Sequence, residues 1–168
     1  MKLYMKQKVF TFVDKFSIYD ELGNEAYWVE GELFSIGKKL DLFDSFNNHK
    51  AHIHQKVLSF FPRYFIQVNG EDVAEVVKHF TLFHQKFSVA GYDWQVDGDF
   101  LAHEYSIYRG DYTIATISKE WFTLGDAYSI NIVDGVEPTS VISVVLIIDA
   151  IISQARNNKS SIAFDIFS

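Results

Sequence analysis

Cysteine is absent from this 168-residue sequence, and its absence excludes three kinds of chemistry. A chain without thiols forms no disulfide, holds no thiolate-bound metal and has no cysteine nucleophile. Charged residues also interrupt positions 1–8 every two or three residues, which leaves no hydrophobic stretch for a signal peptide. We therefore expect a cytoplasmic protein in a reducing compartment.

Basic residues are scarce, since 15 Lys and Arg stand against 22 Asp and Glu and give a formal net charge of -7. This field repels nucleic acid and anionic lipid, so we expect no nucleic-acid partner and only a local anion site. Lys6 and Lys8 share one face of the first expected strand, and Lys38 and Lys39 occupy an expected turn. These four lysines are candidate ligands for an anion or a lipid headgroup. The simpler interpretation is that charged edges prevent strand-to-strand aggregation.

Catalytic motifs are missing as well, including a glycine-rich phosphate loop and a nucleophile elbow. His52 and His54 share one face of an expected strand, but no third ligand is evident, so we interpret them as a polar surface. The run Asp97–Asp99 indicates a solvated turn rather than a calcium loop, and His103 and Glu104 stay unassigned. We expect a non-enzymatic protein with no catalytic residue, metal or cofactor.

The sequence is rich in aromatic and aliphatic residues, which follow strand patterns. Hydrophobic residues make up 48% of it and aromatic residues 17%. Period-two alternation recurs, as in residues 51–57, and turn residues punctuate it. An internal repeat occurs three times: an aromatic residue is followed two positions later by Ile and ten positions later by Ala. The repeat begins at Phe16, Tyr64 and Tyr105, and we interpret these aromatic residues as core. The alternating segments up to Val133 predict about a dozen strands, and a sheet of that size needs closure to avoid free edges.

One segment breaks the strand pattern, and it follows Pro138. Apolar residues at 141–152 cover every side of a helical wheel, so this helix must be enclosed by protein or by lipid. The uninterrupted run is well short of the ~20 residues that span a bilayer. A barrel of about twelve strands has a lumen that something must plug. We therefore predict a central helix at about 138–156 inside the barrel, followed by a short strand at about 161–167.

Asp149 is the most unusual residue of the predicted helix. A carboxylate among apolar side chains must be hydrogen-bonded, lie near a barrel end or be protonated. We interpret Asp149 as a structural buried carboxylate that ties the helix to the backbone of a neighbouring strand or to an arginine. A functional role is the alternative.

Several segments resemble the LURP-one-related family, and in particular its bacterial members. The resemblance rests on Lys8–Phe10, Phe16–Asp20, Gly23-Asn24, Gly31–Asp44, Gln55–Tyr64 and Ile117–Phe122. It covers nearly the whole chain. The resemblance implies the tubby C-terminal-like fold, a twelve-stranded barrel threaded by a hydrophobic helix that is shared with phospholipid scramblases. These motifs are specific for the fold and name no reaction.

We therefore expect one mainly β domain over residues 1–168, a closed antiparallel barrel of about twelve strands around a central hydrophobic C-terminal helix. The favoured function is a non-enzymatic interaction or regulatory module that binds an unknown protein or small ligand. The alternative is a peripheral membrane module that binds anionic phospholipid headgroups, because tubby proteins bind phosphoinositides and scramblases act at membranes. That alternative needs a basic patch strong enough to overcome the overall negative field.

Overall fold

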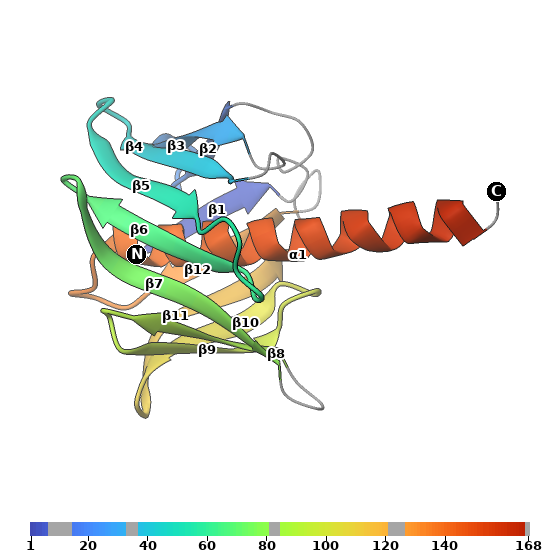
Figure 1. Ribbon diagram of the computed structural model, residues 1–168. Helices are drawn as coiled ribbons and strands as arrows, with labels where there is room; N and C mark the ends of the chain where they lie inside the picture. The colour runs from blue at the N-terminus through green and yellow to red at the C-terminus, as the bar shows by residue number, and fades with distance from the viewer. Residues whose placement is uncertain (7–14, 33–36, 81–84, 121–126, 167–168) are drawn as a thin grey trace.

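A computed structural model describes residues 1–6, 15–32, 37–80, 85–120 and 127–166, which form twelve strands and one helix (Figure 1). The strands are β1 (Lys2–Lys6), β2 (Lys15–Tyr19), β3 (Glu25–Glu32), β4 (Lys39–Asp44), β5 (His49–Gln55), β6 (Arg63–Val68), β7 (Glu71–Phe80), β8 (Gln85–Ala90), β9 (Trp94–Asp99), β10 (Glu104–Arg109), β11 (Tyr112–Glu120) and β12 (Ala127–Ile132). The helix is α1 (Pro138–Ile166).

The strands form a closed antiparallel barrel in which each strand pairs with its neighbours in the sequence. Closure comes from β1 and β12, whose ladder runs from the pair Lys2 and Asn131 to the pair Lys6 and Ala127. Closing the sheet removes the free strand edges that an open sheet of this size would expose. The predicted fold class is confirmed.

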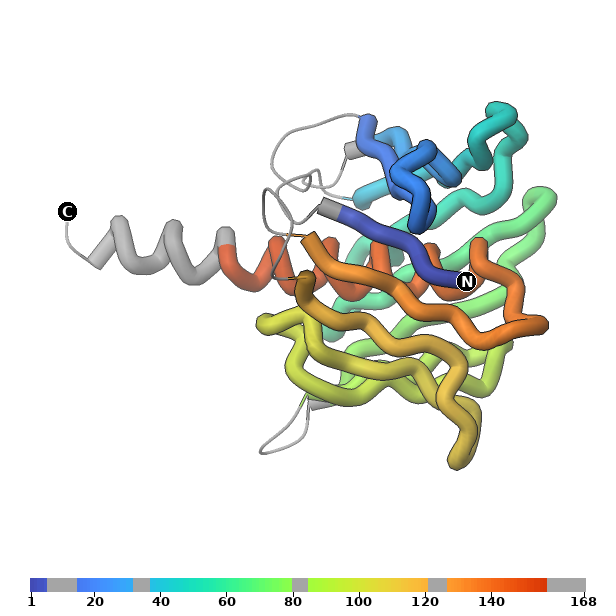
Figure 2. Tube along the Cα trace, turned by 180° about the vertical axis from the view of Figure 1, so that it is seen from behind, coloured from blue at the N-terminus to red at the C-terminus, as the bar shows by residue number. Residues whose placement is uncertain are grey.

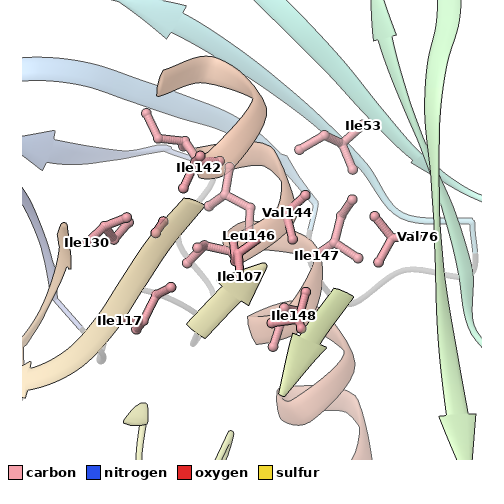
Figure 3. Packing of buried hydrophobic residues seen from close by; sticks show 14 of the residues in the cluster. Ile53, Val76, Ile107, Ile117, Ile130, Ile142, Val144, Leu146, Ile147 and Ile148 are labelled. Atoms are coloured by element: carbon pink, nitrogen blue, oxygen red, sulfur yellow. The ribbon is translucent and has the colours of Figure 1, made fainter. Parts of the chain in front are cut away.

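Helix α1 runs through the lumen of the barrel, as the view from behind also shows (Figure 2). Every residue at positions 141–148 is completely buried. Aliphatic side chains from the barrel wall surround the helix, among them Ile53, Val76 and Ile117 (Figure 3). A barrel of this size encloses more volume than its own wall fills, and an apolar helix supplies the missing side chains.

By length and composition, α1 is also apolar enough to cross a membrane over Pro138–Arg156, but 72% of its apolar window is buried inside the protein. The core helix of a folded domain has these same properties. We therefore interpret the hydrophobicity of α1 as core packing against the barrel.

The predicted strand at about 161–167 is wrong, because α1 continues to Ile166, past its predicted end near residue 156. Residue 167 lies outside the described part of the chain. A strand added here would need an open sheet edge, and the closed barrel offers none. Extending an existing helix instead adds one backbone hydrogen bond for each residue.

A second correction concerns Asp97–Asp99, which belongs to β9 and does not form a turn. Gly98 has a φ of 139° and pairs with Tyr105 on β10. A Cβ atom on Gly98 would lie 2.6 Å from the carbonyl oxygen of Glu104. The glycine therefore permits a close approach of two strands, and the turn follows it at residues 100–103.

The internal repeat corresponds to three hairpins with the same irregularity. Its aromatic residues are buried, which confirms their interpretation as core. A register shift follows the repeated isoleucine in each hairpin, after Ile18, Ile66 and Ile107. Each bulge increases the local twist of its hairpin, which helps a long meander curve into a barrel.

Candidate functional site

The two rims of the barrel are distinct surfaces, because successive strands alternate in direction. Helix α1 starts at the rim formed by residues 20–24, 45–48, 69–70, 91–93, 110–111 and 133–137, which we call the helix-start rim. It leaves through the opposite, helix-exit rim. The described connections there are residues 37–38, 56–62 and 100–103, which lie together with residues 153–156 of α1. The Arg156 guanidinium donates a hydrogen bond of 3.2 Å to the carbonyl oxygen of Leu101 at this rim.

Charge is distributed unequally between the rims. The connections of the helix-start rim contain no Lys or Arg, and their acidic residues are Asp20, Glu21, Asp93, Asp111, Asp134 and Glu137. The described connections of the helix-exit rim have no Asp or Glu, and their cations are Lys38, Lys56 and, on α1, Arg156. Among the connections that the structure describes, those of the helix-exit rim are thus the less acidic, in a protein whose formal net charge is -7.

The connection between β5 and β6, residues 56–62, lies at the helix-exit rim (Figure 1). It exposes apolar side chains there. Leu58 and Phe60 are fully exposed, and Phe61 is half exposed. The Lys56 amide donates a hydrogen bond of 2.9 Å to the carbonyl oxygen of Arg63, which closes the base of this connection. Leu58 has a φ of 64°, an uncommon conformation for leucine. Clustered exposed apolar residues mark contact sites for partners or membranes.

A pocket of about 370 Å³ lies between this connection and α1. The described residues that line it are Gly37, Gln55, Lys56, Val57, Leu58, Ser59, Phe60, Phe61, Pro62, Lys78, Ile151, Gln154 and Ala155. These lining residues include two lysines and no Asp or Glu. The pocket therefore combines an apolar wall with positive charge.

Two buried lysines flank the same connection. Lys78 lines the pocket although its side chain is almost wholly buried, and it continues the inward alternation of Ala74 and Val76 along β7. Lys38, next to the pocket residue Gly37, is buried as well. Its carbonyl oxygen accepts a hydrogen bond of 2.9 Å from the Gln55 amide. Burial lowers the pKa of Lys38 to about 8.

Of the four lysines predicted from the sequence, the structure places only Lys38 beside the pocket. Lys39 is the first residue of β4 and is exposed. Lys6 is the last residue of β1, and Lys8 lies outside the described residues. Sequence analysis missed Lys78, although its two-residue spacing from the apolar inward positions of β7 was a usable signal.

The second cluster of polar side chains surrounds Asp149 inside the barrel. The Tyr128 hydroxyl on β12 donates a hydrogen bond to the Asp149 carboxyl group. His103, from the connection between β9 and β10, stacks on Tyr128 with ring centroids 4.6 Å apart. Its Nδ1 atom lies 3.5 Å from the second Asp149 oxygen. Asp149 therefore joins the helix to a strand side chain. The predicted partner was strand backbone or an arginine.

The charges in this cluster follow from its burial. Burial raises the pKa of Asp149 to about 7, against the opposing effects of the Tyr128 hydrogen bond and Arg156. Burial also lowers the pKa of His103 to about 4, together with repulsion from Arg156 and Lys119. Between these pH values both groups are mainly uncharged, so their contact is not an ion pair. A histidine and a carboxyl group could act as general acid and base, but Asp149 is 3% exposed and His103 is 5% exposed, too little for contact with a substrate.

The histidines of β5 form a cluster on the outer surface. His49 Nε2 and His52 Nδ1 lie 2.8 and 2.9 Å from the same oxygen of Asp41. The ring of His52 also stacks on that of His54, with centroids 5.7 Å apart. Burial alone would raise the pKa of Asp41, but the two histidine hydrogen bonds outweigh it and lower that pKa. Within the described ranges, no group of three His, Asp or Glu residues is arranged to hold a metal ion.

The fold and its polar clusters define a class of protein, a closed twelve-stranded barrel filled by its own C-terminal helix. The sequence model of the family described as LURP-one-related matches residues 1–149. The chain is also 35% identical over 152 residues to the uncharacterized protein YxjI of Bacillus subtilis strain 168, covering 90% of this chain and 94% of that protein. The chain therefore belongs to the LURP-one-related family, which confirms the resemblance. No solved structure matched the chain significantly.

Proposed function

We propose that this protein is a non-enzymatic, cytoplasmic module that docks on anionic membrane surfaces through its helix-exit rim. The opposite composition of the two rims carries the proposal. Exposed Leu58 and Phe60 lie at the rim whose described connections have cations and no carboxylate, whereas carboxylates occupy the connections of the other rim. The docked protein would therefore turn its acidic rim away from the lipid.

The energies of this arrangement favour reversible docking. Burying a Leu or Phe side chain contributes about 1.5–3 kcal/mol. Each lysine or arginine near an anionic leaflet adds about 1 kcal/mol. Contributions of this size sum to no more than about micromolar binding, and the cost of orienting the protein weakens it toward millimolar. Reversible docking is thus the expected behaviour.

The carboxylates of the helix-start rim do not oppose this orientation strongly. Strand β3 has eight residues, which separates the rims by roughly 20 Å after allowing for strand tilt. Electrostatic repulsion is screened within about 8–10 Å at physiological ionic strength. The carboxylates of the helix-start rim are therefore too distant to repel a membrane at the helix-exit rim.

Binding of an unknown protein or small ligand is the function that the sequence favoured, and a protein partner would also cover an exposed apolar connection. Such a partner does not require cations around the apolar side chains. The position of Lys56 in the same connection as Leu58 and Phe60 favours a membrane instead. The burial of His103 and Asp149 supports the non-enzymatic part of the proposal.

Vesicle flotation tests the proposal with a matched pair of variants. We expect the protein to bind vesicles of phosphatidylcholine mixed with phosphatidylglycerol at low salt, and to be released by high salt because salt screens the cations. The double variant Leu58→Ser with Phe60→Ser should lose binding. The control is Leu22→Ser with Phe46→Ser, which removes two side chains that are 88% and 84% exposed at the helix-start rim.

Both double variants should unfold at the temperature of the unmodified protein, because all four side chains are exposed. Absence of binding to the anionic vesicles at low salt would disprove the proposal. Equal loss of binding in both double variants would also disprove it, since the helix-exit rim would then have no special role.

A further inference from the structure

Two connections of the helix-start rim, residues 20–24 and 45–48, each hold a large apolar side chain in solvent. Leu22 in the first connection is 88% exposed, and Phe46 in the second is 84% exposed. We call these two side chains the apolar tips. Each lies two residues after an aspartate and two residues before an asparagine. The chain therefore builds the same turn twice, with an apolar residue at its outermost position.

The first turn is held by the carboxylate of Asp20. This carboxylate accepts hydrogen bonds from the backbone amides of Leu22 and Asn24, at 2.9 and 2.8 Å, and one of 3.1 Å from the side-chain amide of Asn24. The Gly23 amide also donates a bond of 3.1 Å to the carbonyl oxygen of Asp20, and Gly23 has a φ of 82°. These bonds close the turn, so the Leu22 side chain is not needed to hold it.

The second turn repeats these bonds and is also tied to the barrel wall. The Asp44 carboxylate accepts three bonds of 2.9 Å, from the backbone amides of Phe46 and Asn48 and from the side-chain amide of Asn48. The Trp28 indole on β3 donates a bond of 3.1 Å to the side-chain oxygen of Asn47. Both apolar tips are therefore presented by fixed backbone, which lowers the entropy cost of binding a partner.

The apolar tips lie on neighbouring hairpins. Strand β3 of the first hairpin pairs with β4 of the second, and the Ser45 amide donates a bond of 3.1 Å to the carbonyl oxygen of Ala26. The centres of these hairpins are two strand spacings apart, which is about 10 Å. Two turns of an α-helix span about 11 Å. Leu22 and Phe46 can therefore contact the apolar face of one helix at positions two turns apart.

Carboxylates around the apolar tips predict that the partner is basic. All six connections of this rim are among the described residues, and they contain no Lys or Arg. Glu21 is exposed next to the first tip. Burial, and then the negative charges of Glu137 and Asp44, raise the pKa of Tyr27 on β3, so both carboxylates lie near the start of that strand. Lys50 on β5 contributes one positive charge near Asp44. A partner that buries the tips must therefore supply cations around its apolar surface.

We propose that the helix-start rim binds a basic amphipathic helix of a partner protein, with Leu22 and Phe46 against its apolar face and Glu21 and Glu137 toward its lysine or arginine side chains. An anionic membrane does not fit this rim, because it would meet the carboxylates. The inference does not rest on the docking proposal, which concerns the opposite rim. If both are correct, the protein connects a membrane to a basic partner.

Fluorescence anisotropy of a labelled peptide tests the proposal in solution, without vesicles. The probe is an amphipathic helical peptide of leucine and lysine, and its comparison is the same peptide with glutamate in place of lysine. We expect only the lysine peptide to bind, and added salt to weaken its binding. Leu22→Ser with Phe46→Ser should weaken the binding about tenfold or more. The matched control, Leu58→Ser with Phe60→Ser at the opposite rim, should leave it unchanged.

Charge reversal tests the position of the contact on the rim. Glu21→Lys, beside the first tip, should weaken binding of the lysine peptide about fivefold or more. Asp111→Lys makes the same change of charge in the connection between β10 and β11, on the opposite side of the barrel, and should change the binding less than about twofold. Both side chains are exposed, so neither variant should change the unfolding temperature.

Failure of the unmodified protein to bind the lysine peptide would overturn the proposal. Equal losses in the two serine double variants, or in Glu21→Lys and Asp111→Lys, would overturn it too, because the contact would then not be at the apolar tips. A second copy of this chain is the other occupant to test, by sedimentation velocity. We expect a monomer at every concentration. Self-association that disappears in Leu22→Ser with Phe46→Ser would show that a second copy covers the tips, and would overturn the proposal.

Discussion

The Tyr128 hydroxyl donates a hydrogen bond to the Asp149 carboxyl group, and this bond joins the wall of the barrel to the helix that fills it. Both side chains are almost completely buried. Neighbouring positions of α1 contact the wall through apolar side chains alone. A directional bond between a strand and an otherwise apolar helix fixes the rotation of the helix as well as its depth, which non-directional packing specifies less strictly.

Removing the hydroxyl group should therefore destabilise the protein. We expect Tyr128→Phe to lower the free energy of unfolding by about 1–3 kcal/mol, because it leaves a buried carboxyl group without its donor. Tyr64→Phe is the control, since the Tyr64 hydroxyl is equally buried and has no hydrogen-bond partner in the described part of the protein. Urea denaturation measures both. Equal losses in the two variants would show that the hydrogen bond contributes nothing specific.

Asp149→Leu should change the stability of the protein and leave its binding intact. The carboxyl group lies inside the barrel, whereas the proposed docking residues Leu58 and Phe60 lie on the helix-exit rim. We expect altered urea denaturation and unaltered binding to anionic vesicles. A variant that unfolds like the unmodified protein but no longer binds the vesicles would contradict the structural role of Asp149.

The pH dependence of stability should reveal opposite contributions from Asp149 and His103. In the folded protein the pKa of Asp149 is raised from 3.8 to about 7, so its contribution is complete below about pH 4 and is lost as the pH rises to about 7. The pKa of His103 is lowered from 6.5 to about 4, so its contribution is present above about pH 6.5 and is lost as the pH falls. Between pH 4 and 6.5 the two effects oppose each other.

Each single variant should expose the effect of the remaining partner. Relative to the unmodified protein, His103→Phe should lose stability as the pH rises from 4 to 6.5, and Asp149→Leu should gain it, with slopes of up to about 1.4 kcal/mol per pH unit. Urea denaturation across this range provides the measurement. Parallel profiles for all three proteins would show that burial does not shift these two groups.

Gly98→Ala should be more destabilising than Gly70→Ala. Both glycines have positive φ values, 139° for Gly98 and 82° for Gly70. A Cβ atom at Gly98 would lie 2.6 Å from the Glu104 carbonyl oxygen, whereas nothing lies within 4 Å of one at Gly70. We expect a loss of about 1 kcal/mol at Gly70 and about 3 kcal/mol or more at Gly98. Similar losses in thermal unfolding would refute the close approach of β9 and β10.

Two errors in the sequence analysis show where local patterns stop being informative. Glycine is common both in turns and where two strands approach closely. Gly98 could therefore be assigned to a strand only from its pairing with Tyr105 on β10. Alternating apolar residues near the C-terminus predicted a strand at about 161–167, but a strand also needs a free partner edge, and the closed barrel has none. Neither condition is visible in a short window of residues.

The barrel and its helical plug are predictable from the chain, because alternation along each strand and an all-round apolar segment after Pro138 are local properties. Which distant side chains meet depends on the three-dimensional fold. A two-residue slip between strands preserves both faces of a sheet, so alternation leaves the register undetermined. Register and barrel closure brought His103 and Tyr128 to Asp149, and placed Lys78 in a pocket beneath residues 56–62.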